Sequence, residues 1–152
     1  MTICCHERRP LFGEVVGDEM HLNDVGRLVH EEWRKTGAMR ASIELHEFVV
    51  MPNHIHGIIE IVGARCTRPS FAPDGLPDQT GRVQRAPTVG DVVRGYKSAV
   101  TKRVNQLRSL SNSPVWQRNY HEHIIRDEEA YLKIADYVQT NPQRWAEDSY
   151  YV

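Results

Sequence analysis

The sequence contains few cysteines and no long hydrophobic run. Its 152 residues include three cysteines, with Cys4 and Cys5 adjacent and Cys66 distant, which form neither a disulfide framework nor a thiolate zinc site. No apolar stretch approaches the roughly 18 residues of a membrane span. The first residues, Met-Thr-Ile-Cys-Cys, lack the charged and apolar regions of a signal peptide. These absences predict one cytoplasmic domain, residues 1–152, without a membrane partner.

The chain also lacks the strong positive charge of general nucleic-acid binders, since its formal net charge is −1. The basic residues are unevenly placed, because between Arg82 and Arg108 seven lysines and arginines stand against Asp91 alone. The apolar spacing of this stretch turns most of them outward on a predicted helix. The candidates for contact with DNA phosphates are Arg94, Lys97, Lys102 and Arg103, with Arg118 added from a later segment. A solvated helix face is the alternative interpretation.

Hydrophobic periodicity predicts four strands and three helices. The expected strands are Thr2–Cys5, Ile43–Met51, His54–Val62 and Trp116–Arg126, and the expected helices run from Asn23 or Asp24 to Gly37, from Thr88 to Leu107 and from Asp127 to Asn141. Residues 10–17 are expected to form a loop. Residues 63–87 are rich in proline, glycine and polar side chains, which predicts a mobile insertion.

The order β-α-β-β-α-β-α predicts an α+β fold of the ferredoxin-like, split βαβ kind. In this fold an antiparallel sheet carries its helices on one face, and here a C-terminal helix is added. The opposite face of the sheet is then free to hold a site.

Two histidines follow the predicted hairpin corner at Pro52 and Asn53. On a strand, His54 and His56 point to one face and Ile55 to the other, so the two imidazoles converge. The flanking β-branched residues make the strand a stiff support for a metal site or a catalytic pair. Taken alone, the pair is better explained as a half-buried strand that carries two incidental histidines, so other parts of the chain must point to the same place.

The last predicted helix offers two further polar groups. Its core-facing stripe consists of Tyr131, Ile134, Ala135 and Val138. Tyr137 and Asn141 lie together on the flank of this stripe, because residues four apart are neighbours on a helix surface. A rim tyrosine and a C-terminal asparagine before Pro142 would also explain them.

Together these segments resemble the single-tyrosine transposases of the IS200 type, which carry an HUH motif of histidine, hydrophobe and histidine. The similarity is closest to the branch associated with repetitive extragenic palindromes and extends over nearly the whole chain. The segments that carry it are Thr2–Phe12, Val49–Ile59 with the motif Met-Pro-Asn-His-Ile-His-Gly, Gly95–Arg103, Trp116–Glu128 and Asp136–Pro142.

The resemblance implies that Tyr137, on the C-terminal helix, is the nucleophile and that His54, His56 and Asn141 hold a divalent cation, Mg²⁺ or Mn²⁺. It implies a strand transferase that cleaves and rejoins single-stranded, hairpin-forming DNA through a 5′-phosphotyrosine intermediate. It also implies a homodimer acting at the prokaryotic nucleoid. The chemistry agrees, because a tyrosine hydroxyl with a pKa near 10 needs a Lewis acid to attack a phosphodiester.

Other polar residues compete for these roles. The sequence His121-Glu122-His123 is a second pair of histidines, but Glu122 is not a hydrophobe, so we expect Glu122 and His123 to support a ligand or the fold. Tyr120 is a rival nucleophile without an amide at helical spacing. Tyr150 and Tyr151 lie in the tail and are expected to be incidental.

Two other functions stay open at this point. A domesticated protein could keep the fold and bind DNA hairpins with little cleavage. A metal-dependent phosphodiesterase could use water in place of Tyr137.

Overall fold

The computed structural model describes residues 1–62 and 87–151. Its strands are β1 (Thr2–Cys4), β2 (Gly13–Val16), β3 (Glu19–Leu22), β4 (Ile43–Val50) and β5 (His54–Ile61), its α-helices are α1 (Asp24–Ala38), α2 (Val89–Leu107) and α3 (Glu128–Thr140), and its 3₁₀ helices are η1 (His6–Arg8) and η2 (Asn141–Glu147). The predicted insertion at 63–87 lies outside the described residues, except for Pro87. No helix in 1–62 or 87–151 combines the length and the apolar character that crossing a membrane requires.

Local side chains begin each long helix where the sequence predicts it. Asn23 accepts a hydrogen bond from the first turn of α1, and Asp127 does the same for α3. Thr88 and Asp91 form a reciprocal capping box at the start of α2. Pro142 follows the end of α3, as expected for a residue that disfavours helix before it.

The central sheet is antiparallel with the strand order β1-β5-β4. Residues 116–121 lie beyond β1, where two isolated bridges join Cys5 to Trp116 and Thr2 to His121. With residues 116–121 at the edge, the order across the sheet is 116–121, β1, β5, β4, as expected for a ferredoxin-like fold. The predicted α+β fold class is therefore confirmed. The predicted strand Trp116–Arg126 is wrong in detail. The register with β1 shifts by two residues between the bridges Cys5–Trp116 and Thr2–His121, so no regular ladder forms there. Lys97 of α2 donates to the carbonyl oxygens of Gln117 and Arg118, which lie between the two bridges.

A second sheet was not predicted. Residues 13–22 form the hairpin β2–β3, which begins inside the loop expected at residues 10–17 and extends to the residues before α1. Gly17 and Asp18 form its turn, and both have positive φ, 56° and 68°, as a type I′ turn requires. The Gly-Asp pair between two short runs was the available signal.

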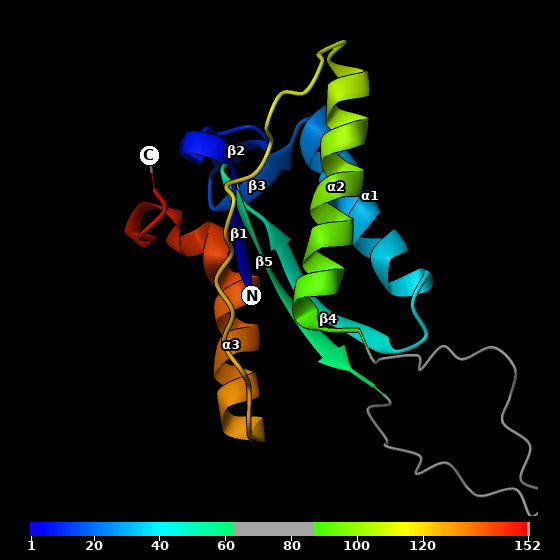
Figure 1. Cartoon of the computed structure of the whole chain (residues 1–152). Helices are drawn as coiled ribbons and strands as arrows, with labels where there is room; N and C mark the ends of the chain where they lie inside the picture. Colours follow the sequence, from blue (N-terminus) through cyan, green and yellow to red (C-terminus); the bar gives the residue numbers. More distant parts are fainter. Residues whose placement is uncertain (63–86, 152) are drawn as a thin grey trace, which may run out of the picture.

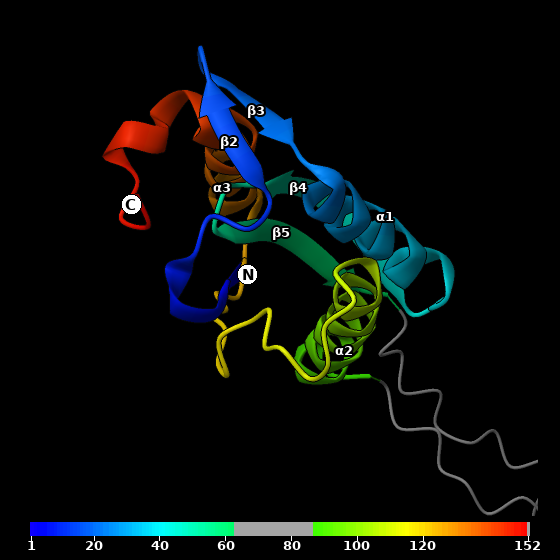
Figure 2. The same cartoon turned by 90° about the horizontal axis from the view of Figure 1, so that it is seen from above.

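The helices lie on both sides of the central sheet. Helices α1 and α2 pack together on one face, and α3 lies against β4 and β5 on the other (Figures 1 and 2). Ile3, Val50 and Ile55 belong to the apolar core under α1 and α2. Because side chains alternate along β5, the neighbours of Ile55 point to the face that α3 covers.

Candidate active site

Strand β5 brings the two predicted histidines together on the α3 side of the sheet. The Nε2 atoms of His54 and His56 lie 2.9 Å apart, and both residues are buried. β5 is the central strand of its sheet, so its backbone is held on both sides by β1 and β4. The convergence that the alternation predicts is therefore present on a rigid element.

Asn53 determines the tautomer of His54. Its amide nitrogen donates to the carbonyl oxygens of Arg8 and Tyr150, so its Oδ1 faces His54 Nδ1 at 2.8 Å. An amide oxygen only accepts hydrogen bonds, and His54 Nδ1 must therefore carry the proton. The lone pair of a neutral His54 is left on Nε2, the atom that faces His56.

Thr2 of β1 plays the corresponding part for His56. Its Oγ1 lies 2.8 Å from His56 Nδ1, and a hydroxyl can accept from an imidazole N–H. When it does, both Nε2 atoms present lone pairs to the same point, and lone pairs this close repel each other unless a proton or a cation lies between them. Burial lowers the pKa of both imidazoles, while the charge of Asp148 opposes this only in part. The pair is neutral near pH 7, as metal binding requires.

Helix α3 and its C-terminal end supply the next groups. The ring of Tyr137 packs against that of His56, with centroids 5.3 Å apart, and its side chain stays partly exposed. Asn141 is completely buried. Its Nδ2 donates to Asp148, whereas its Oδ1 has no hydrogen-bond partner in the part of the chain that the structure describes. A buried amide oxygen without a partner is the kind of atom that a bound cation would satisfy.

Asp148 is the residue that sequence reasoning missed. Helix η2 turns the chain back so that this carboxylate, 1% exposed, lies 4.0 Å from His54 Nε2. It accepts hydrogen bonds from the Tyr137 hydroxyl at 3.2 Å and from Asn141 Nδ2 at 2.9 Å. Burial alone would raise the pKa of Asp148, but the hydrogen bonds from Tyr150 N–H and Asn141 hold this pKa below its usual value. No local spacing in the tail indicates this role.

Tyr150 also has a place that the sequence did not predict. It was expected to be incidental, but its ring lies 4.7 Å from that of His54.

Burial first, and then the charge of Asp148, raises the pKa of Tyr137, so its hydroxyl is protonated at neutral pH.

The donor set fits a divalent cation. The ligand atoms of His54, His56 and Asp148 lie within 4.8 Å of one another, and Asn141 adds the unpartnered amide oxygen. Two neighbouring ligands of an octahedral ion, at about 2.05 Å each, lie about 2.9 Å apart. The spacing of the two Nε2 atoms matches this value. Mixed nitrogen and oxygen donors suit Mn²⁺ and also permit Mg²⁺.

The predicted DNA-contact residues divide into two groups. Lys97, Lys102 and Arg118 line one groove between α2 and the segment that follows it. Arg94 forms an ion pair with Asp91, and Arg103 forms ion pairs with two acidic residues of α1. The structure thus gathers three of the five in one place.

Glu122 and His123 lie beyond the bridge to β1. Glu122 accepts a hydrogen bond from Tyr120 at 3.1 Å. His123 lines a separate cavity with His46 and Tyr131. Their expected supporting role at the metal site stays a prediction.

Comparisons with known proteins agree with the fold. No protein-family model matches the sequence. An uncharacterized protein of Haemophilus influenzae is 42% identical over 156 aligned positions, which cover 100% of this chain and 83% of that protein. The structure of a REP-associated tyrosine transposase bound to a REP hairpin is similar with a TM-score of 0.52 and 21% identity. The match covers 94% of this chain but only 64% of the transposase chain.

Proposed function

We propose that this chain, which belongs to the same protein family as the uncharacterized Haemophilus influenzae protein, is a metal-dependent DNA strand transferase. It cleaves and rejoins single-stranded, hairpin-forming DNA through a 5′-phosphotyrosine link. The observation that carries the proposal is the convergence of His54, His56, Asn141 and the Tyr137 hydroxyl around one buried carboxylate. The fold shared with a tyrosine transposase that was solved with a hairpin supports it.

The residues divide the chemistry between them. His54, His56 and Asn141 would hold the cation, with the Asp148 carboxylate beside them. When bound, the cation supplies a Lewis acid for the phosphate oxygens and for the leaving oxygen. Tyr137 Oη gives its proton to Asp148 and forms a bond to phosphorus, the bond from phosphorus to the 3′ oxygen breaks, and this oxygen takes a proton from solvent and leaves as a free 3′-hydroxyl. Because the phosphotyrosine keeps the energy of the broken bond, a later 3′-hydroxyl can reseal the strand without a nucleotide cofactor.

Asp148 has a second part in the proposal. Its Oδ2 accepts the hydrogen bond of the Tyr137 hydroxyl, which orients this hydroxyl at the edge of the histidine pair. Asp148 Oδ2 is therefore within hydrogen-bond distance to accept the proton that the hydroxyl gives up. The single domain at 1–152 and the homodimer remain parts of the same proposal.

A labelled DNA hairpin with a single-stranded flank and Mn²⁺ tests this function. We expect a protein–DNA adduct that survives denaturation, and its loss in Tyr137→Phe. Tyr131→Phe is the matched control, because its hydroxyl lies on the same helix and bonds to Glu47 instead. His56→Ala should abolish Mn²⁺-dependent cleavage.

A metal-dependent phosphodiesterase is the second candidate, because Asp148 places a carboxylate beside the histidines where it could orient a water. DNA cleavage that leaves no protein–DNA adduct and persists in Tyr137→Phe would favour this candidate over the strand transferase. Hairpin binding without cleavage would instead indicate a domesticated binding protein.

A further inference from the structure

Strand β4 bulges between Leu45 and Phe48, where it has one residue more than β5. A bulge re-aims the side chains beside it. Here it turns both His46 and Glu47 to the side of the sheet that α3 covers, where the Tyr131 hydroxyl contacts each of them. The bulge thus adds an imidazole to the face of the sheet that also carries the candidate active site.

Three possible metal ligands meet beside this bulge. Glu44 lies directly opposite Glu60 in the pairing of β4 with β5. The carboxylates of Glu44 and Glu60 and the ring of His46 each place one ligand atom within 4.8 Å of the other two. The side chains of His46 and Glu60 are 28% and 56% exposed, so an ion in solution can reach them.

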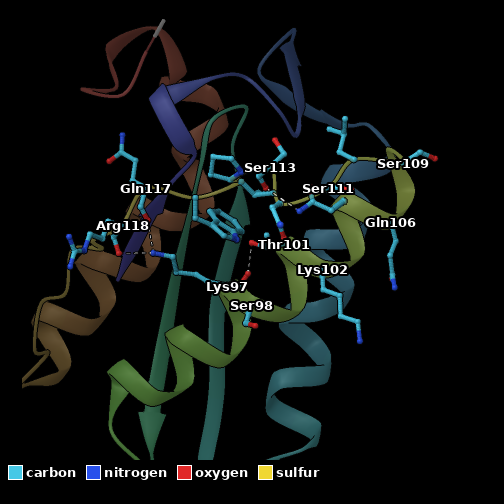
Figure 3. A pocket seen from close by; sticks show the side chains of 16 residues that line it. Lys97, Ser98, Thr101, Lys102, Gln106, Ser109, Ser111, Ser113, Gln117 and Arg118 are labelled. Carbon is cyan, nitrogen blue, oxygen red and sulfur yellow. Dashed lines mark hydrogen bonds between the residues drawn. The ribbon is translucent and has the colours of Figure 1, made fainter.

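The two carboxylates have no basic side chain beside them. Like charges directly opposite each other on paired strands repel. Within 1–62 and 87–151, no lysine or arginine forms an ion pair with Glu44 or Glu60. Basic side chains gather instead in the groove beside α2, which is lined by Lys97, Lys102 and Arg118 (Figure 3). A cation from solution would remove the repulsion between the carboxylates.

The contacts of Tyr131 turn a lone pair of His46 toward Glu60. The Tyr131 hydroxyl donates its one proton to Glu47 Oε2 at 2.9 Å, so its oxygen can only accept from His46 Nδ1, 3.4 Å away. When His46 donates there, its unprotonated Nε2 faces Glu60 Oε2 at 2.9 Å. Two acceptors at this distance repel each other unless a proton or a cation lies between them.

We propose that Glu44, His46 and Glu60 form a second site for a divalent transition-metal ion, independent of the strand transferase. Imidazole nitrogen and carboxylate oxygen are both usual ligands of Zn²⁺, and three protein ligands leave room for water. The site opens on a cavity of about 1000 Å³ that His46 and Glu60 line together with His123, and that no lysine or arginine lines.

The position of the site indicates a structural part for the ion. His56 and Glu60 are four residues apart on β5, so the two metal sites are about 13 Å apart and bind separate ions. The second ion would join β4 to β5 beside the bulge, where the pairing of their backbones is interrupted.

Equilibrium dialysis of the full chain against Zn²⁺ counts the bound ions. Glu44→Gln with Glu60→Gln removes both carboxylates from exposed positions, and this variant should bind one Zn²⁺ fewer than the unchanged protein. The control pair, Glu14→Gln with His21→Gln, removes an exposed glutamate and histidine that lie opposite each other on β2 and β3, and should bind as many ions as the unchanged protein. No loss in the first variant, or an equal loss in the control, would overturn the proposal.

The imidazole nitrogen resonances place the ion. His46→Gln identifies the resonances of His46 by their loss. Saturating Zn²⁺ should move His46 Nε2 to the chemical shift of a metal-bound imidazole, and should not do so in Glu44→Gln with Glu60→Gln. A His46 resonance that Zn²⁺ leaves in place would indicate an ordinary ion pair with Glu60 and overturn the proposal.

The stoichiometry separates this proposal from the catalytic one. A single Zn²⁺ that is lost in Glu44→Gln with Glu60→Gln and kept in His56→Ala would uphold the second site and count against a metal at the histidine pair. A single Zn²⁺ that is lost in His56→Ala and kept in the glutamine variant would remove the second site and keep the catalytic one.

Discussion

Thr2→Val should weaken metal binding without disturbing the fold. The substitution removes the hydroxyl that lies 2.8 Å from His56 Nδ1 and keeps a β-branched side chain on β1. His56 then loses the partner that orients its ring and keeps the lone pair on Nε2. Loss of such a supporting hydrogen bond typically costs about 10- to 100-fold in metal affinity, or about 1.4–2.8 kcal/mol.

Isothermal titration calorimetry of the full chain with Mn²⁺ measures the predicted loss of metal affinity directly. Thr36→Val is the matched control, because the buried Thr36 hydroxyl bonds to the carbonyl oxygen of Glu32 within α1, away from the histidines. We expect the control to bind Mn²⁺ like the unchanged protein. Equal Mn²⁺ affinity in Thr2→Val and the control would refute the assignment of Thr2 as the residue that orients His56.

Three further changes test other parts of the structure. A methyl group at Gly57 would meet Trp33 at 2.8 Å, so Gly57→Ala should lower the free energy of unfolding by about 1–3 kcal/mol; an unchanged urea midpoint would contradict this close packing. Asp148→Asn keeps the side-chain shape but removes its charge, and Mn²⁺ titration should show weaker binding; equal affinity would exclude the carboxylate from the metal site. Lys102→Gln with Arg118→Gln should reduce the salt slope of single-strand binding by about 1.4 in fluorescence anisotropy, and an unaltered slope would make both residues merely solvated.

Features that depend on neighbours in sequence were predictable. The caps at Asn23, Thr88 and Asp127 lie within one turn of the backbone groups that they bind, so the helix starts follow from short patterns. The alternation of His54 and His56 about Ile55 is likewise a property of any strand. The fold class followed because these local elements in this order have few ways to pack.

Features that depend on contacts across the chain were decided only by the tertiary structure. Lys97 donates to backbone carbonyl oxygens about twenty residues away, in a segment that pairs with β1 through two isolated bridges and not as the predicted last strand. Thr2 reaches His56 through the pairing of β1 with β5. Asp148 reaches Tyr137 and His54 because η2 reverses the chain after α3. The sequence alone determined which side chains could form the site, because their spacing along β5 and α3 is local. The packing of distant segments decided which further groups complete it, because no periodicity encodes a contact between residues that meet only in the folded chain.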